Sequence, residues 1–178
     1  MIGPGSLDWT TATDVPNLLA APVLATLRGW GPASSVLAAA IDPELADTAA
    51  FCERYDVRMA DSANCVVIAG RRGEDVRYAA CVVLATTRAD VNGVVRKRLD
   101  ARKASFAPMA EATALSGMEY GGITPIGLPA QWPVLVDRAV LDREVVVIGS
   151  GVRRSKIAIP SAALASLPGA EVLDGLAS

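Results

Sequence analysis

Two β-rich runs separated by a short turn constrain the fold more than any other feature of this sequence. Residues 64–70 read NCVVIAG and residues 76–85 read VRYAACVVLA, with RRGED between them. RRGED has the composition of a hairpin turn. Strands joined by so short a connection pair antiparallel, because a parallel pair needs a crossover of a dozen or more residues. The pattern therefore predicts a β-hairpin near the middle of the chain.

Helical patterns and further strands follow one another irregularly along the rest of the chain. We expect helices at residues 14–30, 42–55, 87–101, 107–117 and 161–168, and strands at 34–41, 133–137, 144–151 and 156–160. Pro22 should reset the first helix and Asp42 should cap the second. Thr87 or Asp90 should cap the third, and Gly117 should end the fourth. This order lacks a βαβα repeat, so it predicts a mixed α+β domain.

Length and composition indicate a compact globular chain. It has 178 residues, of which 52% are hydrophobic and 20% charged, and no apolar run is long enough to span a bilayer. The first residues lack the basic and apolar regions of a signal peptide, so we expect a cytoplasmic protein without a membrane partner. Three cysteines, Cys52, Cys65 and Cys81, stand far apart with no CxxC pair. They are interpreted as reduced core thiols rather than disulfides or zinc ligands.

The absence of histidine restricts the chemistry of the chain. The sequence contains no histidine. This excludes Ser-His-Asp and Cys-His catalysis, histidine general bases and most transition-metal sites. Carboxylates are not clustered either, so we expect neither a metal nor another cofactor. Any reaction must use carboxylates, lysines, hydroxyls or the backbone.

Residues 116–129, SGMEYGGITPIGLP, hold four glycines and two prolines. Loops that combine these residue types are rigid and permit close approach of the backbone. The dinucleotide GxGxxG motif and the P-loop motif both fail, because here a helix precedes the loop, a strand follows it and the required lysine is absent. Two interpretations remain from the residues alone: Gly121 and Gly122 expose backbone groups to a ligand, or the segment is an unusual turn.

This loop, followed by PVLVD, VVVIGSG and IAIP, resembles the C-terminal half of YbaK-like aminoacyl-tRNA editing domains, also called prolyl-tRNA synthetase-associated domains. The resemblance extends back through KRLDARKASFAPMAEATALSG and NCVVIAG to about residue 43. It implies a mixed, largely antiparallel, barrel-like sheet flanked by helices. It also implies an editing domain at residues 31–178, preceded by a helical extension at 1–30. The implied activity is hydrolysis of the ester that joins a wrong amino acid to the 3′ end of a tRNA.

The resemblance also implies the residues of the site. Gly121 and Gly122 match the loop glycines whose backbone positions the attacking water and the ester. The second loop, beside the amino-acid pocket, is matched by three consecutive residues: Gly149, Ser150 and Gly151. Asn64 and Cys65 match a family Lys-Thr pair, whose lysine engages the substrate near the terminal adenosine.

The family lysine is therefore absent from this chain. Asn64 can form hydrogen bonds but carries no positive charge. Lys156, which follows the second loop, is a candidate replacement, and the alternative is that it lies at a solvated strand end. Asn64 likewise has the alternative of a turn residue that opens a strand.

Charge is compatible with a tRNA substrate but does not by itself indicate one. The net charge is −2, which argues against a non-specific nucleic-acid binder. Residues 96–103, RKRLDARK, carry five cations, and arginine pairs occur at Arg71–Arg72 and Arg153–Arg154. The 96–103 cluster is either a solvated helix face or a phosphate track. We expect Arg153 and Arg154 to contact phosphates, because they adjoin the second loop.

Three functions follow from these observations. The first is a free-standing deacylase that acts in trans on mischarged tRNA. Association with a synthetase is compatible with this function. The second is a binding module that lost turnover with the family lysine and still recognises an aminoacyl-adenosine or a tRNA 3′ end. The third is a hydrolase or binder of a small aminoacyl or nucleotide-like metabolite. None of them involves DNA, and the sequence leaves the amino acid and the oligomeric state open.

Overall fold

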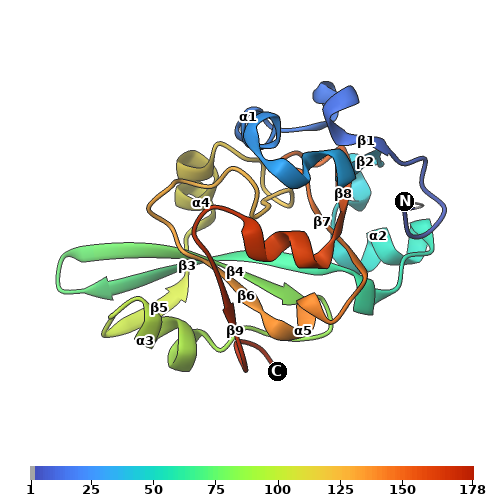
Figure 1. Cartoon of the computed structure of the whole chain (residues 1–178). Coiled ribbons are helices and arrows are strands. Elements are labelled where there is room, and N and C mark those ends of the chain that lie inside the picture. The colour runs from blue at the N-terminus through green and yellow to red at the C-terminus, as the bar shows by residue number, and fades with distance from the viewer. Residues whose placement is uncertain (1–2) are drawn as a thin grey trace.

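The fold consists of two β-sheets with short helices packed around them. A computed structural model describes residues 3–178 (Figure 1). The strands are β1 (Thr10–Thr11), β2 (Leu37–Ala40), β3 (Ala63–Arg72), β4 (Asp75–Leu84), β5 (Lys103–Phe106), β6 (Val134–Asp137), β7 (Val145–Gly149), β8 (Ser155–Pro160) and β9 (Ala170–Leu173). The α-helices are α1 (Ala21–Gly29), α2 (Thr48–Tyr55), α3 (Arg96–Arg98), α4 (Met109–Ser116) and α5 (Arg138–Leu141).

The predicted hairpin is confirmed as β3 and β4. These strands pair antiparallel from Ala63 with Leu84 to Arg72 with Asp75. Only two residues connect them, and Gly73 has a φ of 61°. Such turns need a positive φ at the first central residue, because their twist must match that of the strands. Figure 1 shows the hairpin as the longest feature of the molecule, with β5 and α3 beside its outer part.

The α+β class is confirmed, but the expected barrel-like sheet is not what the strands form. One sheet has the order β5-β3-β4-β6-β9, with antiparallel and parallel pairs, and the other has the antiparallel order β1-β2-β8-β7. The sheets touch through a parallel bridge between Ser62 and Val147. The strands of residues 3–178 therefore form two separate sheets and no closed barrel, and the residues after this bridge on β3 and β7 line a cavity.

The helix predicted to start after Asp42 begins later. The Asp42 carboxylate accepts a hydrogen bond from the Glu44 N–H, but it caps only a 3-10 turn at Pro43–Leu45. Helix α2 starts at Thr48, where the Asp47 carboxylate accepts hydrogen bonds from two N–H groups of the first turn. Its end at Tyr55 was predicted correctly. The sequence contains two capping aspartates five residues apart, and the second one starts the α-helix.

The segment after β4 differs more from its prediction. Of the two caps proposed, Thr87 and Asp90, the structure has Asp90. Val91–Val95 then form a π-helical turn, and only the single turn of α3 follows as α-helix. Strand β5 was not predicted, because its sequence KASF contains no β-branched residue. It exists because it pairs with β3, and this pairing is a tertiary effect. The predicted end of α4 at Gly117 is confirmed, with φ at 69°.

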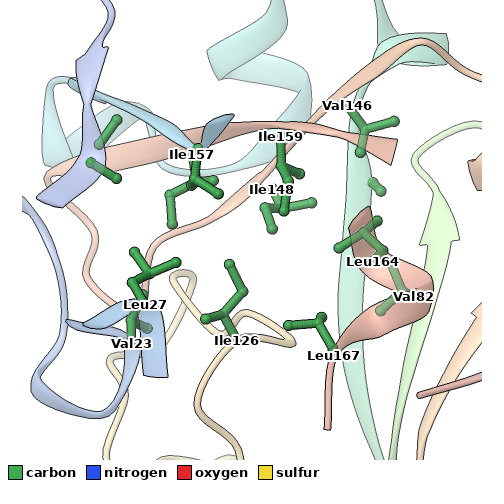
Figure 2. Close-up of a cluster of buried hydrophobic side chains, with 14 of the residues drawn as sticks. Val23, Leu27, Val82, Ile126, Val146, Ile148, Ile157, Ile159, Leu164 and Leu167 are labelled. Atoms are coloured by element: carbon green, nitrogen blue, oxygen red, sulfur yellow. The ribbon is translucent and has the colours of Figure 1, made fainter. Parts of the chain in front are cut away.

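The main hydrophobic core lies between α1, the four-stranded sheet and the glycine-rich loop (Figure 2). Val23 and Leu27 of α1 face Ile148 and Ile157 of the sheet, and Ile126 of the loop lies among them. Helix α1 thus contributes side chains to this core, while the division into 1–30 and 31–178 stays a prediction. No helix within residues 3–178 is long and apolar enough to cross a membrane.

Ile126 anchors the glycine-rich loop, so its truncation should destabilise the protein. Its side chain is fully buried. We expect Ile126→Ala to lower the free energy of unfolding by about 2–5 kcal/mol, measured by urea denaturation, because a buried cavity forms. Leu115→Ala, at a position that is 49% exposed, is the control and should cost much less. Equal losses from the two substitutions would show that Ile126 does not anchor the loop.

Candidate functional site

A cavity opens where β3 and β7 diverge beyond the Ser62–Val147 bridge. Its volume is about 300 Å³. The walls come from the start of α2, the first half of β3, the β5–α4 connection, residues 120, 121 and 123 of the glycine-rich loop, the end of β7 and Lys156 on β8. These segments are distant in sequence, so only the fold brings them together. Asn64, Cys65, Gly121, Gly149 and Lys156, all predicted site residues, line this cavity.

Strand pairing explains the positions of three of these residues. The Ser62–Val147 bridge sets β3 beside β7 in parallel, so Asn64 and Gly149 lie at equivalent positions beyond it. Gly149 pairs in turn with Lys156 across the antiparallel β7–β8 ladder. The asparagine, the glycine and the lysine therefore occupy one end of the two sheets. A change of register on either strand would separate them, because adjacent residues on a strand face opposite sides.

The two loop glycines have different structural roles. Gly121 lines the cavity with a φ of 78°, and within the described part of the chain its N–H and C=O have no hydrogen-bond partner. Both backbone groups of Gly122 are engaged: its N–H donates to the Glu119 carbonyl, and its carbonyl accepts from the Gly151 N–H at 2.7 Å. Gly121 can therefore offer backbone groups to a ligand, whereas Gly122 joins the loop to the segment after β7.

Close backbone packing explains why glycine occupies positions 122 and 149. A Cβ atom at Gly122 would lie 2.7 Å from the backbone of Val152. A Cβ atom at Gly149 would lie 2.6 Å from the carbonyl oxygen of Gly122. Contacts this short require one segment to move. The glycines of the two loops thus hold the segments in direct backbone contact.

Ser150 and Gly151 lie behind the cavity wall. Ser150 is fully buried, and its hydroxyl is 2.6 Å from the hydroxyl of Ser155. Gly151 has a φ of 87° and contributes the N–H that binds Gly122. The structure therefore places neither residue at the cavity surface with Gly149, and both support the loop from behind.

Lys156 is a buried cation in the cavity wall. Its side chain is only 7% exposed, its ammonium donates to the Ala46 carbonyl at 2.9 Å, and it lies 5.2 Å from the centre of the Phe51 ring. Burial lowers the pKa of Lys156 to about 8, while nearby Cys52 and Asp47 act in the opposite direction. An ammonium has three N–H donors, so two remain for a ligand. The predicted alternative of a solvated strand end does not fit a residue this buried.

Asn64 is held by a partner that the sequence did not indicate. Its side-chain oxygen accepts a hydrogen bond from the Thr48 hydroxyl at 2.8 Å. Thr48 is the first residue of α2 and also lines the cavity. This bond leaves the amide N–H groups of Asn64 as donors. The position of Thr48 was missed because the helix was expected to start at Asp42.

Cys65 is a poor nucleophile in this setting. Burial raises the pKa of its thiol strongly, and the neighbouring Cys81 adds to the effect. The thiol therefore stays protonated at neutral pH, and the thiolate is the reactive form.

Within residues 3–178, no group of three or more acidic or cysteine side chains could hold a metal ion.

Arg153 and Arg154 are engaged with the protein itself. Arg153 donates to the carbonyls of Tyr120 and Pro43, which braces the rim of the cavity beside Gly121. Arg154 donates to the carbonyl of Asn17 in the N-terminal segment. Neither side chain lines the cavity. Their expected contact with phosphates stays a prediction, and these bonds give both side chains a structural role.

The rim of the cavity carries exposed apolar side chains that sequence analysis did not single out. Phe106 is 64% exposed, Tyr120 60% and Met109 45%, and all three line the cavity. Large apolar residues left in water around an opening are typical of binding surfaces. Phe106 lies in the unpredicted strand β5, so its place at the rim was not accessible from the sequence.

The comparisons with known proteins agree with this fold. Residues 42–167 match the model of a family described as aminoacyl-tRNA editing domain. A crystal structure of a proposed trans-editing enzyme for prolyl-tRNA synthetase has 20% identity and a TM-score of 0.73, and the match covers 87% of this chain and 94% of that one. The hypothetical protein APE2540 has 20% identity and a TM-score of 0.66, with 75% and 85% of the two chains covered.

The structural matches, at this level of identity, concern the fold, and no match is found among curated protein sequences. The family model spans more than half of the chain and includes every residue of the cavity described above. The chain belongs to the aminoacyl-tRNA editing domain family.

Proposed function

We propose that this protein is a free-standing deacylase that hydrolyses the ester of mischarged aminoacyl-tRNA. The observation that carries the proposal is the shared cavity, where the unpaired backbone of Gly121, the amide of Asn64 and the ammonium of Lys156 converge. Membership of the editing-domain family supports the substrate class. The proposed partner is therefore the 3′ end of a tRNA, and association with a synthetase and location in the cytoplasm are parts of the same proposal.

The size of the cavity supports an amino-acid ester as the group bound inside. About 300 Å³ is at the lower end of the range for small-molecule sites. This volume accommodates an amino acid and its ester linkage, so the nucleoside would lie toward the open rim. The inner wall includes Phe51, Ile123 and Val147, which favour an apolar amino-acid side chain.

The proposed reaction needs no histidine. A water molecule held by the free backbone of Gly121 attacks the ester carbonyl carbon, and the bond between that carbon and the ribose oxygen breaks. The products are a free amino acid and a tRNA with a free hydroxyl group. Negative charge develops on the carbonyl oxygen during attack, and fixed donors in a partly dry site stabilise it. Asn64 N–H groups and the Lys156 ammonium are the donors available in this cavity.

Lys156 replaces the missing family lysine in this proposal. The cation reaches the cavity from β8 instead of from β3, where Asn64 stands. Its burial and its single protein acceptor leave the charge available to a substrate oxygen. This assignment supports the hydrolase over the binding module. The binding module was proposed because position 64 lacks a cation, and Lys156 supplies one. The acidic composition favours the remaining alternative, a small aminoacyl metabolite as substrate.

Moving the cation tests this assignment. We expect Lys156→Met to lower kcat/KM for deacylation by roughly ten- to a hundredfold, because a charge-assisted hydrogen bond is lost. The double variant Asn64→Lys with Lys156→Met should recover part of that loss by returning a cation to β3. The measurement is release of amino acid from a panel of mischarged tRNAs, with urea denaturation to check folding.

The outcomes of this experiment separate the functions. Full activity of Lys156→Met on every active substrate would remove Lys156 from the mechanism. A native protein inactive on the whole panel, with activity appearing only after Asn64→Lys, would favour the binding module. Activity on a free aminoacyl ester but not on any tRNA would favour the small-metabolite alternative.

The pKa of Lys156 predicts the pH dependence of activity. Lys156 is a cation below about pH 8 and neutral above it. The ratio of kcat/KM between the native protein and Lys156→Met should therefore be constant at lower pH and fall as pH rises through 8, by about tenfold per further unit until the two proteins are equal. Using the ratio removes the contribution of hydroxide to ester hydrolysis. A ratio that stays constant to pH 10 would contradict a role for the charged form.

A further inference from the structure

A second depression of the surface is lined by cations. Its residues come from the end of β3, from the π-helical turn and the start of α3, and from β5 with the residue before it. They include Arg71, Asn92, Arg96, Arg102, Lys103 and Ser105. We call these six residues the basic groove. Four of them are cations and none is a carboxylate, although the net charge of the chain is −2. Such a concentration of one charge in a concave surface attracts anions.

The cations of the groove are not neutralised by neighbouring acids. Among the described residues, Arg71, Arg96, Arg102 and Lys103 form no ion pair, whereas Arg72 lies 2.6 Å from Asp100. Arg77 approaches that carboxylate as well, at 3.8 Å. The nearby acid Asp100 is thus occupied by arginines outside the groove. Arg96 donates only to backbone carbonyls, which leaves its charge uncompensated.

The basic groove and the cavity are lined by neighbouring stretches of β3. Cys65 and Val67 line the cavity, whereas Ala69 and Arg71 line the groove. The two sites are therefore consecutive along one strand, and Arg71 is about 13 Å from Val67 at about 3.3 Å per residue.

Strand β5 connects the two sites along the sheet edge. Lys103 pairs with Arg71 at the groove, and Phe106 pairs with Ile68 toward the cavity. Phe106 lines the cavity and exposes its ring at the rim. Three residues of a strand span about 10 Å, which corresponds to about three nucleotides of a stacked strand at 3.4 Å each. An exposed aromatic ring next to a basic track is typical of proteins that bind single-stranded nucleic acid.

We propose that the basic groove binds backbone phosphates of the RNA strand that leads to the 3′ end held in the cavity, with Phe106 stacking on a base between them. This inference rests on the proposed function for the identity of the RNA. It assigns a role to the 96–103 cluster and to Arg71, and it explains how a protein of negative net charge binds tRNA. The groove fixes the strand, and the cavity holds the ester.

Salt dependence of tRNA binding tests the groove separately from catalysis. The probe is an uncharged tRNA transcript with a 5′ fluorophore, and the dissociation constant is measured by anisotropy across a series of NaCl concentrations. The test variant carries Arg71→Gln, Arg102→Gln and Lys103→Gln. We expect the slope of log Kd against log salt to fall by about 2, since each phosphate contact of a single strand contributes about 0.7. Affinity at low salt should fall at least roughly tenfold.

The control removes the same charge elsewhere. Arg28, Arg88 and Arg138 lie outside both the groove and the cavity, so their replacement by glutamine should leave the slope nearly unchanged. Phe106→Ala should weaken binding without changing the slope, because stacking does not release counterions. Equal slopes for the groove variant and the control variant would overturn the proposal. The absence of measurable tRNA binding by the native protein would overturn it as well.

Deacylation kinetics distinguish this proposal from the proposed function. For a mischarged tRNA that the native protein hydrolyses, the groove variant should show a KM raised by a factor similar to that in Kd, with kcat unchanged. Hydrolysis of the corresponding aminoacyl-adenosine, which is too short to reach the groove, should not change. A native protein that binds tRNA through the groove but hydrolyses no substrate would uphold the groove and reject the deacylase. Hydrolysis of tRNA unaffected by the groove variant would reject the groove alone.

Discussion

The backbone contact between the glycine-rich loop and the segment after β7 is the constraint on which the site depends. The Gly122 carbonyl accepts the Gly151 N–H, and the Gly149 backbone lies against the carbonyl of Gly122. Side chains at these positions would separate the segments. The contact leaves Gly121 at the cavity surface, with its N–H and C=O unbonded to any residue in the range 3–178. This backbone contact therefore exposes the backbone groups of Gly121 that the proposed hydrolysis needs.

A buried cation lies next to this contact. Lys156 pairs with Gly149 across β7 and β8, and the carbonyl oxygens of Gly122 and Ile123 occupy the place that a side chain at 149 would take. Isolated charges are costly to bury, and the lowered pKa of Lys156 reflects that cost. The Ala46 carbonyl and the Phe51 ring offset it in part. A buried lysine with free donors in a cavity is a feature of binding and catalytic sites more than of stabilising ones.

The two proposed sites divide substrate recognition between different physical interactions. The cavity is small and mostly apolar, with a few donors, which suits an amino-acid ester. The basic groove is polar and exposed, which suits the phosphates of a strand in water. Strand β3 carries both, and its pairing with β5 keeps them at a fixed separation. A protein of negative net charge can bind phosphates in this way, because the cations of the groove act locally.

Local sequence patterns predicted the elements that depend on residues close together in the sequence. The hairpin followed from two valine-rich runs and a turn, and the end of α4 followed from Gly117. The absence of histidine excluded whole classes of catalysis. The resemblance to editing domains indicated the family and four residues that line one cavity, although it did not separate the role of Gly121 from that of Gly122. Lys156, the fifth, was a candidate because of its charge and its place after the second loop.

Tertiary structure decided what depends on contacts between distant segments. Strand β5 has no β-branched residue and exists through its pairing with β3. Burial of Lys156 depends on α2, β7 and β8 together, and no local pattern distinguishes a buried lysine from a solvated one. The basic groove joins Arg71 to a cluster some 30 residues away, through a strand that was not predicted. Sequence periodicity reports which face of an element is apolar, whereas the neighbours of that face are set by packing of the whole chain.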